Sequence, residues 1–330
     1  MARKQSTPPL PILLNHPYFK KEGFEAFKQM DMQDSDVIMA SFPKCGTSWM
    51  HQIMFCLLRM DDNGKLPSNE DQLLGKDGQI YPDSLNMESG HSGMNGNFAF
   101  KDLLEQPAPR LFTTHSRADQ LPSTLHQKGR LVVVARNPKD AFVSMFFFME
   151  KLSKSWFPEY KEVTAEGMEK SFERYHQLIP SVDAPRGSSD YYIYYKMMVA
   201  FLRKIGLDGV GQTSSFPPRG FITFYEELHE NFHDEVHRLA AFLGVSLTPK
   251  KFAALAERVN FGSMSGTAEG AKMHFKKAHV TTRKGVVGDY SNHLTEQHWA
   301  RVDALFQEQL GEIDEFKPIF SIMKANKPRL

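Results

Sequence analysis

A lysine, a glycine and two hydroxyl side chains follow a short apolar run near the N-terminus and could together bind an anion. Lys44, Gly46, Thr47 and Ser48 come shortly after residues 37–40, whose apolar side chains are typical of a buried strand. A helical pattern begins at Ser48, and Thr47 or Ser48 could cap that helix. The first N–H groups of a helix lack intrahelical partners, and the helix dipole favours negative charge there. The segment therefore predicts a loop that binds a phosphate or sulfate group.

A second candidate anion site follows the clearest buried strand of the sequence. Residues 130–136 read RLVVVAR, with charge only at the ends, and a helix is expected over residues 140–151. Arg136 ends the strand and Ser144 lies in the helix, so both can face one ligand at the carboxyl end of the strand. A guanidinium group beside a hydroxyl suits a phosphate monoester. The alternative is a surface arginine paired with Asp140.

Two further segments carry residues suited to the same chemistry. The C-terminal run RKGVVGDY, residues 283–290, combines two cations with two glycines, so its backbone N–H groups can approach an anion closely. His115 closes an expected strand over residues 111–114. Imidazole titrates near neutral pH and can accept a proton from a hydroxyl group, although a lone histidine is more often a surface residue.

The order of these segments predicts the fold. Strand, loop and helix recur along the chain, which favours an α/β fold with a central parallel sheet flanked by helices. Another strand is expected over residues 221–225, followed by a helix from about residue 226 to residue 243. Because no repeat or linker interrupts the sequence, we expect a single domain over residues 36–330, after an N-terminal lead of residues 1–35.

Composition excludes several classes of function. The 330 residues carry a net charge of +1, which gives no reason to expect nucleic-acid binding. No apolar run is long enough to span a membrane, and the N-terminus is a poor signal peptide. Cys45 and Cys56 are the two cysteines, too few for a disulfide framework, and without a histidine or carboxylate cluster they make no zinc site. We therefore expect a cytoplasmic protein that binds no metal and no membrane.

Taken together, the motifs resemble those of the cytosolic sulfotransferases, from about residue 35 to residue 310. The matching segments are PKCGTSW at residues 43–49, RNPKDAFVS at 136–144, RKGVVGDY at 283–290 and, less closely, YEEL at 225–228 and NFGSM at 260–264. These enzymes take a sulfuryl group from 3′-phosphoadenosine 5′-phosphosulfate (PAPS). The resemblance implies a P-loop-like sulfotransferase fold and transfer to a hydroxyl or amine of a small molecule, such as a phenol, a sterol or another alcohol.

The resemblance also implies a role for each matching residue. His115 would be the general base, Lys44 would stabilise the leaving 3′-phosphoadenosine 5′-phosphate (PAP), and Ser144 would restrain Lys44. The expected donor-binding residues are Lys44, Cys45, Gly46, Thr47, Ser48, Trp49, Arg136, Ser144, Tyr225, Phe261, Arg283, Lys284 and Gly285. The acceptor pocket is expected to include Phe147 and Phe148, with Arg117 beside the base.

This sequence departs from the family pattern at several positions. Cys45 replaces a serine, and a thiol at a helix N-terminus beside Lys44 should have a lowered pKa. Either only its backbone is used, or its oxidation blocks donor binding. Thr113 stands where the family has a lysine, and Arg117 stands where it has a proline. A cation next to His115 would favour a polar or acidic acceptor.

Two alternatives to an active sulfotransferase remain, and so does the question of assembly. One alternative is a PAPS-binding or PAP-binding protein whose catalysis has decayed. The other is a P-loop kinase, which the missing G-K-[ST] sequence disfavours. A homodimer stays open, although the family's dimer motif is poorly kept: Thr295 is present, whereas Ser291, Glu296 and Ala300 replace its other residues.

Overall fold

The computed structural model describes residues 21–66, 100–155, 167–168, 191–208, 217–266 and 283–325. In that part of the chain four strands form one parallel sheet in the order β2-β1-β3-β4. Their bounds are β1 (Val37–Ser41), β2 (Leu111–Thr114), β3 (Arg130–Ala135) and β4 (Gly220–Phe224). The predicted central parallel sheet is confirmed.

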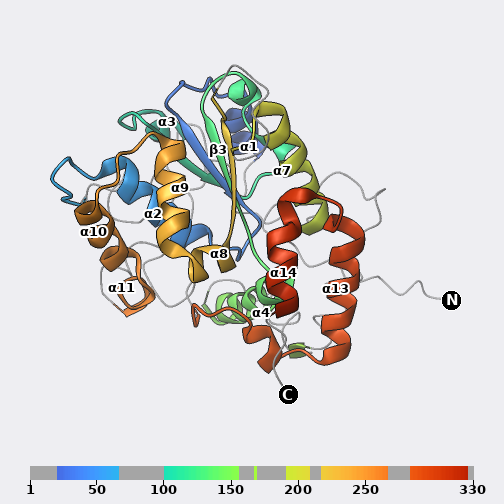
Figure 1. The fold of residues 1–330 in the computed structure, drawn as a ribbon. Coiled ribbons are helices and arrows are strands. Elements are labelled where there is room, and N and C mark those ends of the chain that lie inside the picture. Colours follow the sequence, from blue (N-terminus) through green and yellow to red (C-terminus); the bar gives the residue numbers. More distant parts are fainter. Residues whose placement is uncertain are drawn as a thin grey trace.

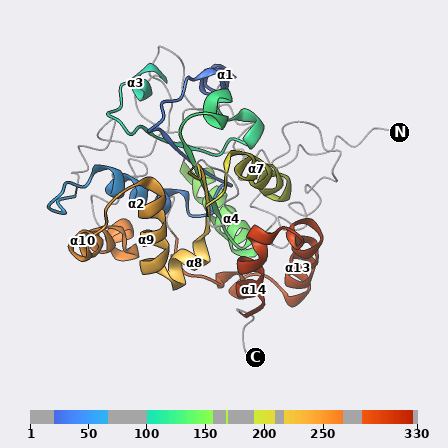
Figure 2. The same ribbon diagram turned by 45° about the horizontal axis from the view of Figure 1, so that its top comes forward.

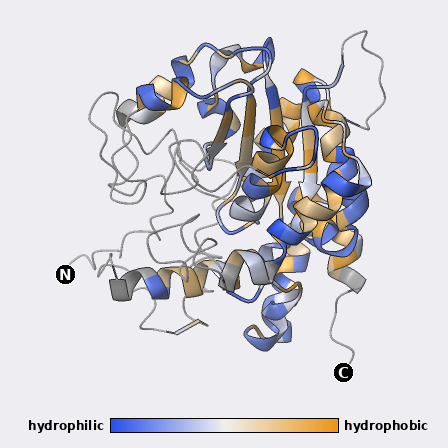
Figure 3. Ribbon diagram, turned by 90° about the vertical axis from the view of Figure 1, so that its left-hand side faces the viewer, coloured by the Kyte–Doolittle hydropathy of each residue, from blue (hydrophilic) through white to orange (hydrophobic). Residues whose placement is uncertain are grey.

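The strands are apolar because both faces of the sheet are covered. Every residue of β1 and β4 is buried, as is all of β3 after Arg130. A parallel sheet with helices on both faces requires such nearly continuous apolar strands. In Figure 3 the strands accordingly show hydrophobic colours, while the surrounding helices mix hydrophobic and hydrophilic residues.

Alternate residues of each strand point into two different cores. Val37, Met39 and Val132 pack against α2 (Thr47–Arg59), α9 (Phe232–Leu243) and α10 (Pro249–Val259). Ile38 and Val133 pack on the opposite face, against α7 (Tyr191–Ile205), α13 (Glu296–Leu310) and α14 (Lys317–Ala325). Figure 1 shows these two groups of helices on either side of β3.

Like α2, helices α4 (Pro138–Ser155) and α8 (Tyr225–Glu230) begin at the carboxyl edge of the sheet. The chain enters α4 after β3 and α8 after β4. Figure 2 shows α4 and α8 together at that edge. The other helices of the described residues are α1 (Lys21–Gln29), α3 (Phe100–Leu104), α11 (Phe261–Gly266) and short 3₁₀ turns at Ala118–Gln120, Ser123–His126, Asp289–Asn292 and Asp314–Phe316.

Some local expectations were wrong. The single helix expected over residues 226–243 is broken at Asn231, whose backbone (φ −123°, ψ 43°) is not helical, so α8 and α9 are separate. Helix α14 was not predicted. Thr295, kept from the dimer motif, caps α13 by accepting a hydrogen bond from the N–H of His298 at 3.3 Å.

The described part of the N-terminal lead packs on the sheet. Phe27 of α1 is buried and contacts Phe112 of β2, with ring centroids 6.3 Å apart. The division at residue 35 stays a prediction. Among the described helices, none is both long and apolar enough to cross a bilayer.

Candidate active site

The residues that follow the four strands meet at one edge of the sheet. The loop of residues 42–46 follows β1, His115 follows β2, Arg136 follows β3 and Tyr225 follows β4. Ala40 lies beside Thr114, Ser41 beside Val134 and Ala135 beside Phe224 in the strand register. Open α/β sheets bind ligands at this edge.

The loop of residues 42–46, called the anion loop below, has an unusual backbone. Lys44 and Gly46 have positive φ values of 68° and 94°. A Cβ atom on Gly46 would lie 2.8 Å from a ring carbon of Tyr225, so the glycine permits both the turn and the close approach. Gly46 occupies the N-cap of α2 and no side chain caps the helix. The expected cap by Thr47 or Ser48 was therefore wrong.

Thr47 is instead the first residue of α2, and its hydroxyl contacts the preceding strand. Its Oγ1 atom lies 2.6 Å from Oγ of Ser41, the last residue of β1. This contact fixes the strand end against the helix start. Because α2 begins directly after the anion loop, its first-turn N–H groups lie at the sheet edge, where an anion site is expected.

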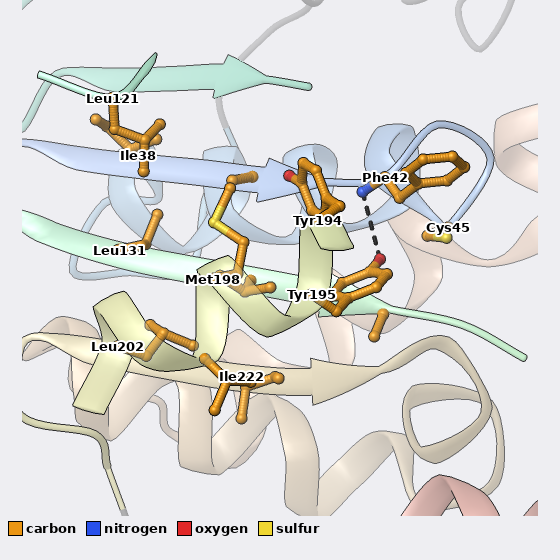
Figure 4. Packing of buried hydrophobic residues seen from close by; sticks show 14 of the residues in the cluster. Ile38, Phe42, Cys45, Leu121, Leu131, Tyr194, Tyr195, Met198, Leu202 and Ile222 are labelled. Atoms are coloured by element: carbon orange, nitrogen blue, oxygen red, sulfur yellow. Dashed lines mark hydrogen bonds between the residues drawn. The ribbon is translucent and has the colours of Figure 1, made fainter. Parts of the chain in front are cut away.

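Cys45 lies inside the core rather than at the ligand surface. Its side chain is buried, and Figure 4 shows it beside Tyr195. Burial raises the pKa of the thiol to about 12, outweighing the opposite effects of a hydrogen bond with Tyr195 and the charges of Arg136 and Lys44. The expected lowering of this pKa was wrong, because desolvation exceeds the effect of the nearby cation. The backbone of Cys45, rather than its buried side chain, is therefore suited to bind a donor.

Two tyrosines on α7, which the motifs did not predict, hold the edge together. The hydroxyl of Tyr195 donates to the Val134 carbonyl at 2.7 Å. The same hydroxyl accepts the N–H of Phe42 at 3.3 Å, the hydrogen bond drawn in Figure 4. The hydroxyl of Tyr191 donates to the carbonyl of Arg136. The anion loop and the end of β3 are thus tied to one helix. The aromatic run in α7 was the available sequence signal, but it did not reveal these partners.

Lys44 lies over an aromatic ring of α4. Its Nζ atom is 4.2 Å from the ring centroid of Phe148. Burial, followed by the positive charges of Arg136, Lys151 and Arg283, lowers the pKa of Lys44 to about 7. Ser144 is buried and precedes Phe148 by four residues, so both lie on one face of α4. That Ser144 restrains Lys44 stays a prediction.

His115 is held in one orientation by the backbone of β1. Its Nδ1 atom lies 2.7 Å from the carbonyl oxygen of Ser41. Because a carbonyl only accepts, Nδ1 carries the proton and Nε2 is the basic nitrogen of the neutral ring. Burial lowers the pKa of His115 to about 4, with a smaller contribution from Lys44 and an opposing one from the Ser41 hydrogen bond. The imidazole is therefore neutral at pH 7.

Arg136 is buried with part of its hydrogen-bonding capacity unused. Its terminal nitrogens donate to the carbonyls of Lys44 at 3.1 Å and Val286 at 3.4 Å. Its guanidinium carbon lies 4.2 Å from the ring centroid of Tyr225. Its Nε atom has no partner among the described residues. A buried donor without an acceptor is costly, so this atom suits an anionic ligand. The alternative of a surface arginine is wrong.

The C-terminal basic segment is fixed by two carboxylates. Asp140 of α4 accepts the backbone N–H groups of Gly288 at 2.7 Å and Tyr290 at 3.0 Å. Asp289 binds both expected cations: Arg283, and Lys284 at 2.8 Å. Burial would raise the pKa of Asp289, but its hydrogen bonds with Lys284, Asn292 and Arg283 lower it overall.

Aromatic rings border the anion loop on the α9 side. The Trp49 ring stacks on Phe232, with centroids 5.8 Å apart, and meets Tyr225 edge-on at 5.4 Å. Its indole N–H donates to the carbonyl of Val259 at 2.9 Å. These rings would suit a flat heterocycle such as adenine. Phe261 begins α11, but its side chain lies outside the described part of the chain.

The expected acceptor-pocket residues contact different partners. Phe148 contacts Lys44, whereas Phe147 lies 5.0 Å from the ring of His293 and 5.2 Å from the guanidinium of Arg283. Arg117 forms a two-point ion pair with Asp119, at 3.1 and 2.9 Å, which offsets its charge.

Thr113, which replaces the lysine of the family pattern, is buried and contacts a histidine of α2. Its hydroxyl lies 2.8 Å from Nδ1 of His51. A polar pair therefore joins β2 to α2 two residues before His115, where the family pattern has a cation. Nothing in the motifs predicted this partner for Thr113.

A sulfotransferase domain, defined by comparison with families of known proteins, matches residues 34–314. The chain belongs to the sulfotransferase family. The sulfotransferase relatives include sulfotransferase 6B1 of Danio rerio, 25% identical over 292 residues that cover 88% of this chain and 83% of that protein. Cytosolic sulfotransferase 5 of Arabidopsis thaliana is 27% identical over 300 residues, 86% of this chain and 82% of its own.

Solved structures of similar fold agree with this membership. Mouse sulfotransferase SULT7A1, solved with PAP, superposes with a TM-score of 0.65 at 21% identity, covering 94% of this chain and 95% of the other. A retinol dehydratase solved with androsterone and PAP gives a TM-score of 0.58 at 18% identity, covering 90% and 87%. The predicted P-loop-like sulfotransferase fold is thereby confirmed, and the protein is a sulfotransferase.

Proposed function

We propose that this sulfotransferase moves a sulfuryl group from PAPS to a hydroxyl or amine group of a small molecule and releases PAP. The observation that carries the proposal is the convergence of Lys44, His115 and Arg136 at one sheet edge, with Nε2 of His115 as the basic nitrogen. Relatives of similar fold were solved with PAP, which supports the same donor here.

The donor fits the charges and hydrogen bonds of the site. The first turn of α2, with Thr47 and Ser48, suits the 5′-phosphate of PAPS. The unused Nε atom of Arg136 suits the 3′-phosphate, with Ser144, Arg283, Lys284 and the backbone at Gly285. Trp49 and Tyr225, together with Phe261, would border the adenine.

The proposed reaction is an in-line displacement at sulfur. Nε2 of His115 takes the proton of the acceptor hydroxyl while the acceptor oxygen forms a bond to sulfur. The bond between sulfur and the oxygen that bridges to the 5′-phosphate breaks, and its electron pair leaves with PAP. Lys44 stabilises the charge that develops on that oxygen. Ser144, on the same face of α4 as Phe148, restrains Lys44 before the acceptor arrives.

No metal enters this mechanism. The described residues contain no group of three or more histidine, cysteine or acidic side chains placed to hold an ion. Metal independence stays a prediction, tested by activity in the presence of a chelator. Two relatives are named cytosolic sulfotransferases, and we propose the cytoplasm for this chain as well.

The acceptor pocket is proposed to include Phe148, with Phe147 and Arg117 as further candidates. Solved relatives hold retinol or androsterone, so apolar alcohols are the first acceptors to test. The ring of Phe148 beside Lys44 supports a flat apolar acceptor. Since Arg117 is already paired with Asp119, an acidic acceptor is not required by its charge.

The test is release of PAP from PAPS with a panel of phenols, sterols and retinoids, with chelator present. We expect His115→Ala to lower kcat about 10²–10⁴-fold, the usual contribution of a general base, with PAP affinity unchanged. The exposed His126 supplies the control, because His126→Ala should be silent. PAP binding without turnover of any acceptor would favour the decayed binding protein. Phosphoryl transfer from ATP would favour the kinase.

A further inference from the structure

A buried glutamate at the edge of the sheet has no role in the reaction described above. Glu226 is the second residue of α8 and is fully buried. Its Oε1 atom accepts the backbone N–H of Asn137 at 2.9 Å. Its Oε2 atom has no hydrogen-bond partner in the described part of the chain. An ionised oxygen left in this state is costly, so the carboxyl group is poised to become neutral.

The surroundings of Glu226 join it to the expected 3′-phosphate site. Asn137 directly follows Arg136, so the hydrogen bond to Glu226 fixes the turn that carries the guanidinium. The two side chains are not joined by an ion pair, and Nε of Arg136 and Oε2 of Glu226 each lack a partner among the described residues. The carboxyl therefore feels the charge of Arg136 without neutralising it.

The groups around Glu226 come from four segments of the chain. Arg136 after β3 favours its ionised form, and Asp140 of α4 disfavours it. The negative charge of Glu226 raises the pKa of Tyr225 in α8 and of Cys45 in the anion loop. Both side chains are neutral near pH 7. Burial, the largest influence, raises the pKa of Glu226 to about 7. Its ionisation near neutral pH thus depends on the charge at Arg136.

We propose that Glu226 is a positioning residue of the donor site that takes up a proton when a 3′-phosphate binds to Arg136. The bound anion cancels the positive charge that keeps the carboxylate ionised and adds a negative charge nearby. The carboxylate then takes one proton from the solvent and becomes a neutral acid. Its hydrogen bond to Asn137 holds the turn in both states. This inference rests on the proposed use of PAPS.

Calorimetric titration in buffers of different ionisation enthalpy measures the proton uptake. The ligands are PAP and adenosine 5′-phosphate, which lacks the 3′-phosphate, so any uptake at Lys44 is common to both. At pH 7.5 PAP should take up about three quarters of a proton more than adenosine 5′-phosphate, the ionised fraction expected for a carboxyl that titrates near neutrality.

Two glutamine variants separate the charge from the hydrogen bond. Glu226→Gln keeps an acceptor for Asn137 but cannot ionise, so it should bind PAP and lose the difference in proton uptake between the two ligands. The matched control is Glu227→Gln, since Glu227 feels Glu235 and Arg238 rather than Arg136, and it should keep the difference. If Glu226 had only a structural role, Glu226→Gln would show the same difference in proton uptake between PAP and adenosine 5′-phosphate as the wild type.

The wild-type protein provides a second measurement that needs no variant. The ratio of PAP affinity to adenosine 5′-phosphate affinity should fall by up to about tenfold per pH unit above pH 7. Equal proton uptake for both ligands, or a difference that survives in Glu226→Gln, would overturn the role of Glu226 while leaving the donor proposal intact. Failure of the wild-type protein to bind PAP would overturn the proposed function and this inference together.

Discussion

The carboxylate of Asp140 accepts the backbone N–H of Gly288 at 2.7 Å, although the two residues are 148 positions apart in the sequence. The same carboxylate accepts the N–H of Tyr290 at 3.0 Å. The aspartate of the RNPKD motif thus anchors the C-terminal basic segment. Two motifs that are separate in the sequence form one structural unit.

Breaking this anchor should weaken donor binding. In Asp140→Asn an amide replaces one accepting oxygen and the negative charge is lost, so the segment carrying Arg283 and Lys284 loosens. A hydrogen bond to a charged group contributes about 1.5–3 kcal/mol, so PAP affinity should fall roughly 10- to 100-fold by calorimetry. The control is Asp303→Asn in α13. It breaks a different ion pair of α4, the one between Asp303 and Lys139. Equal losses of affinity in both variants would contradict the anchoring role.

Substitution of Gly46 should cost both stability and binding. In Gly46→Ala the new methyl group would lie 2.8 Å from the Tyr225 ring at a φ of 94°, so the ring or the loop must move. We expect a loss of about 1–3 kcal/mol in the free energy of unfolding and weaker PAP binding. Gly244→Ala is the matched control, with a φ of 75° but no atom within 4 Å. It should lose stability alone.

The charge of Lys44 should make donor binding depend on pH. With its pKa lowered to about 7, the free enzyme holds the cation below pH 7 and loses it above. Affinity for adenosine 5′-phosphate should therefore decline as pH rises from 6.5 to 9, by up to about tenfold per unit. Lys44→Met should bind weakly at every pH, while the exposed Lys128→Met should follow the wild type. A flat wild-type profile would be inconsistent with this charge.

Cys45 should resist alkylation in the folded protein. A thiol whose pKa is raised to about 12 forms very little thiolate at pH 8. Iodoacetamide should react at least about 10³-fold more slowly than with an ordinary cysteine, as measured by mass spectrometry, with urea-unfolded protein as the control. Cys45→Ser should keep PAP affinity. Rapid alkylation that PAP prevents would instead revive the oxidation hypothesis.

The sequence predicted the elements better than their tertiary contacts. The apolar runs predicted as strands correspond to β1, β2, β3 and β4, because buried parallel strands leave a strong local pattern. The hydrogen bond from Tyr195 to Val134 and the burial of Cys45 depend on how α7 packs across the sheet. No local spacing encodes that packing. The break at Asn231 was also missed, because the flanking sequence is helical on both sides.

Ser41 serves two parts of the site at once. Its carbonyl orients His115, and its hydroxyl contacts Thr47 at the start of α2. A small displacement of this strand end would change proton transfer and donor alignment in the same step. We therefore expect diversification of the acceptor range to act through α4, which carries Phe148, rather than through β1, whose last residue orients His115.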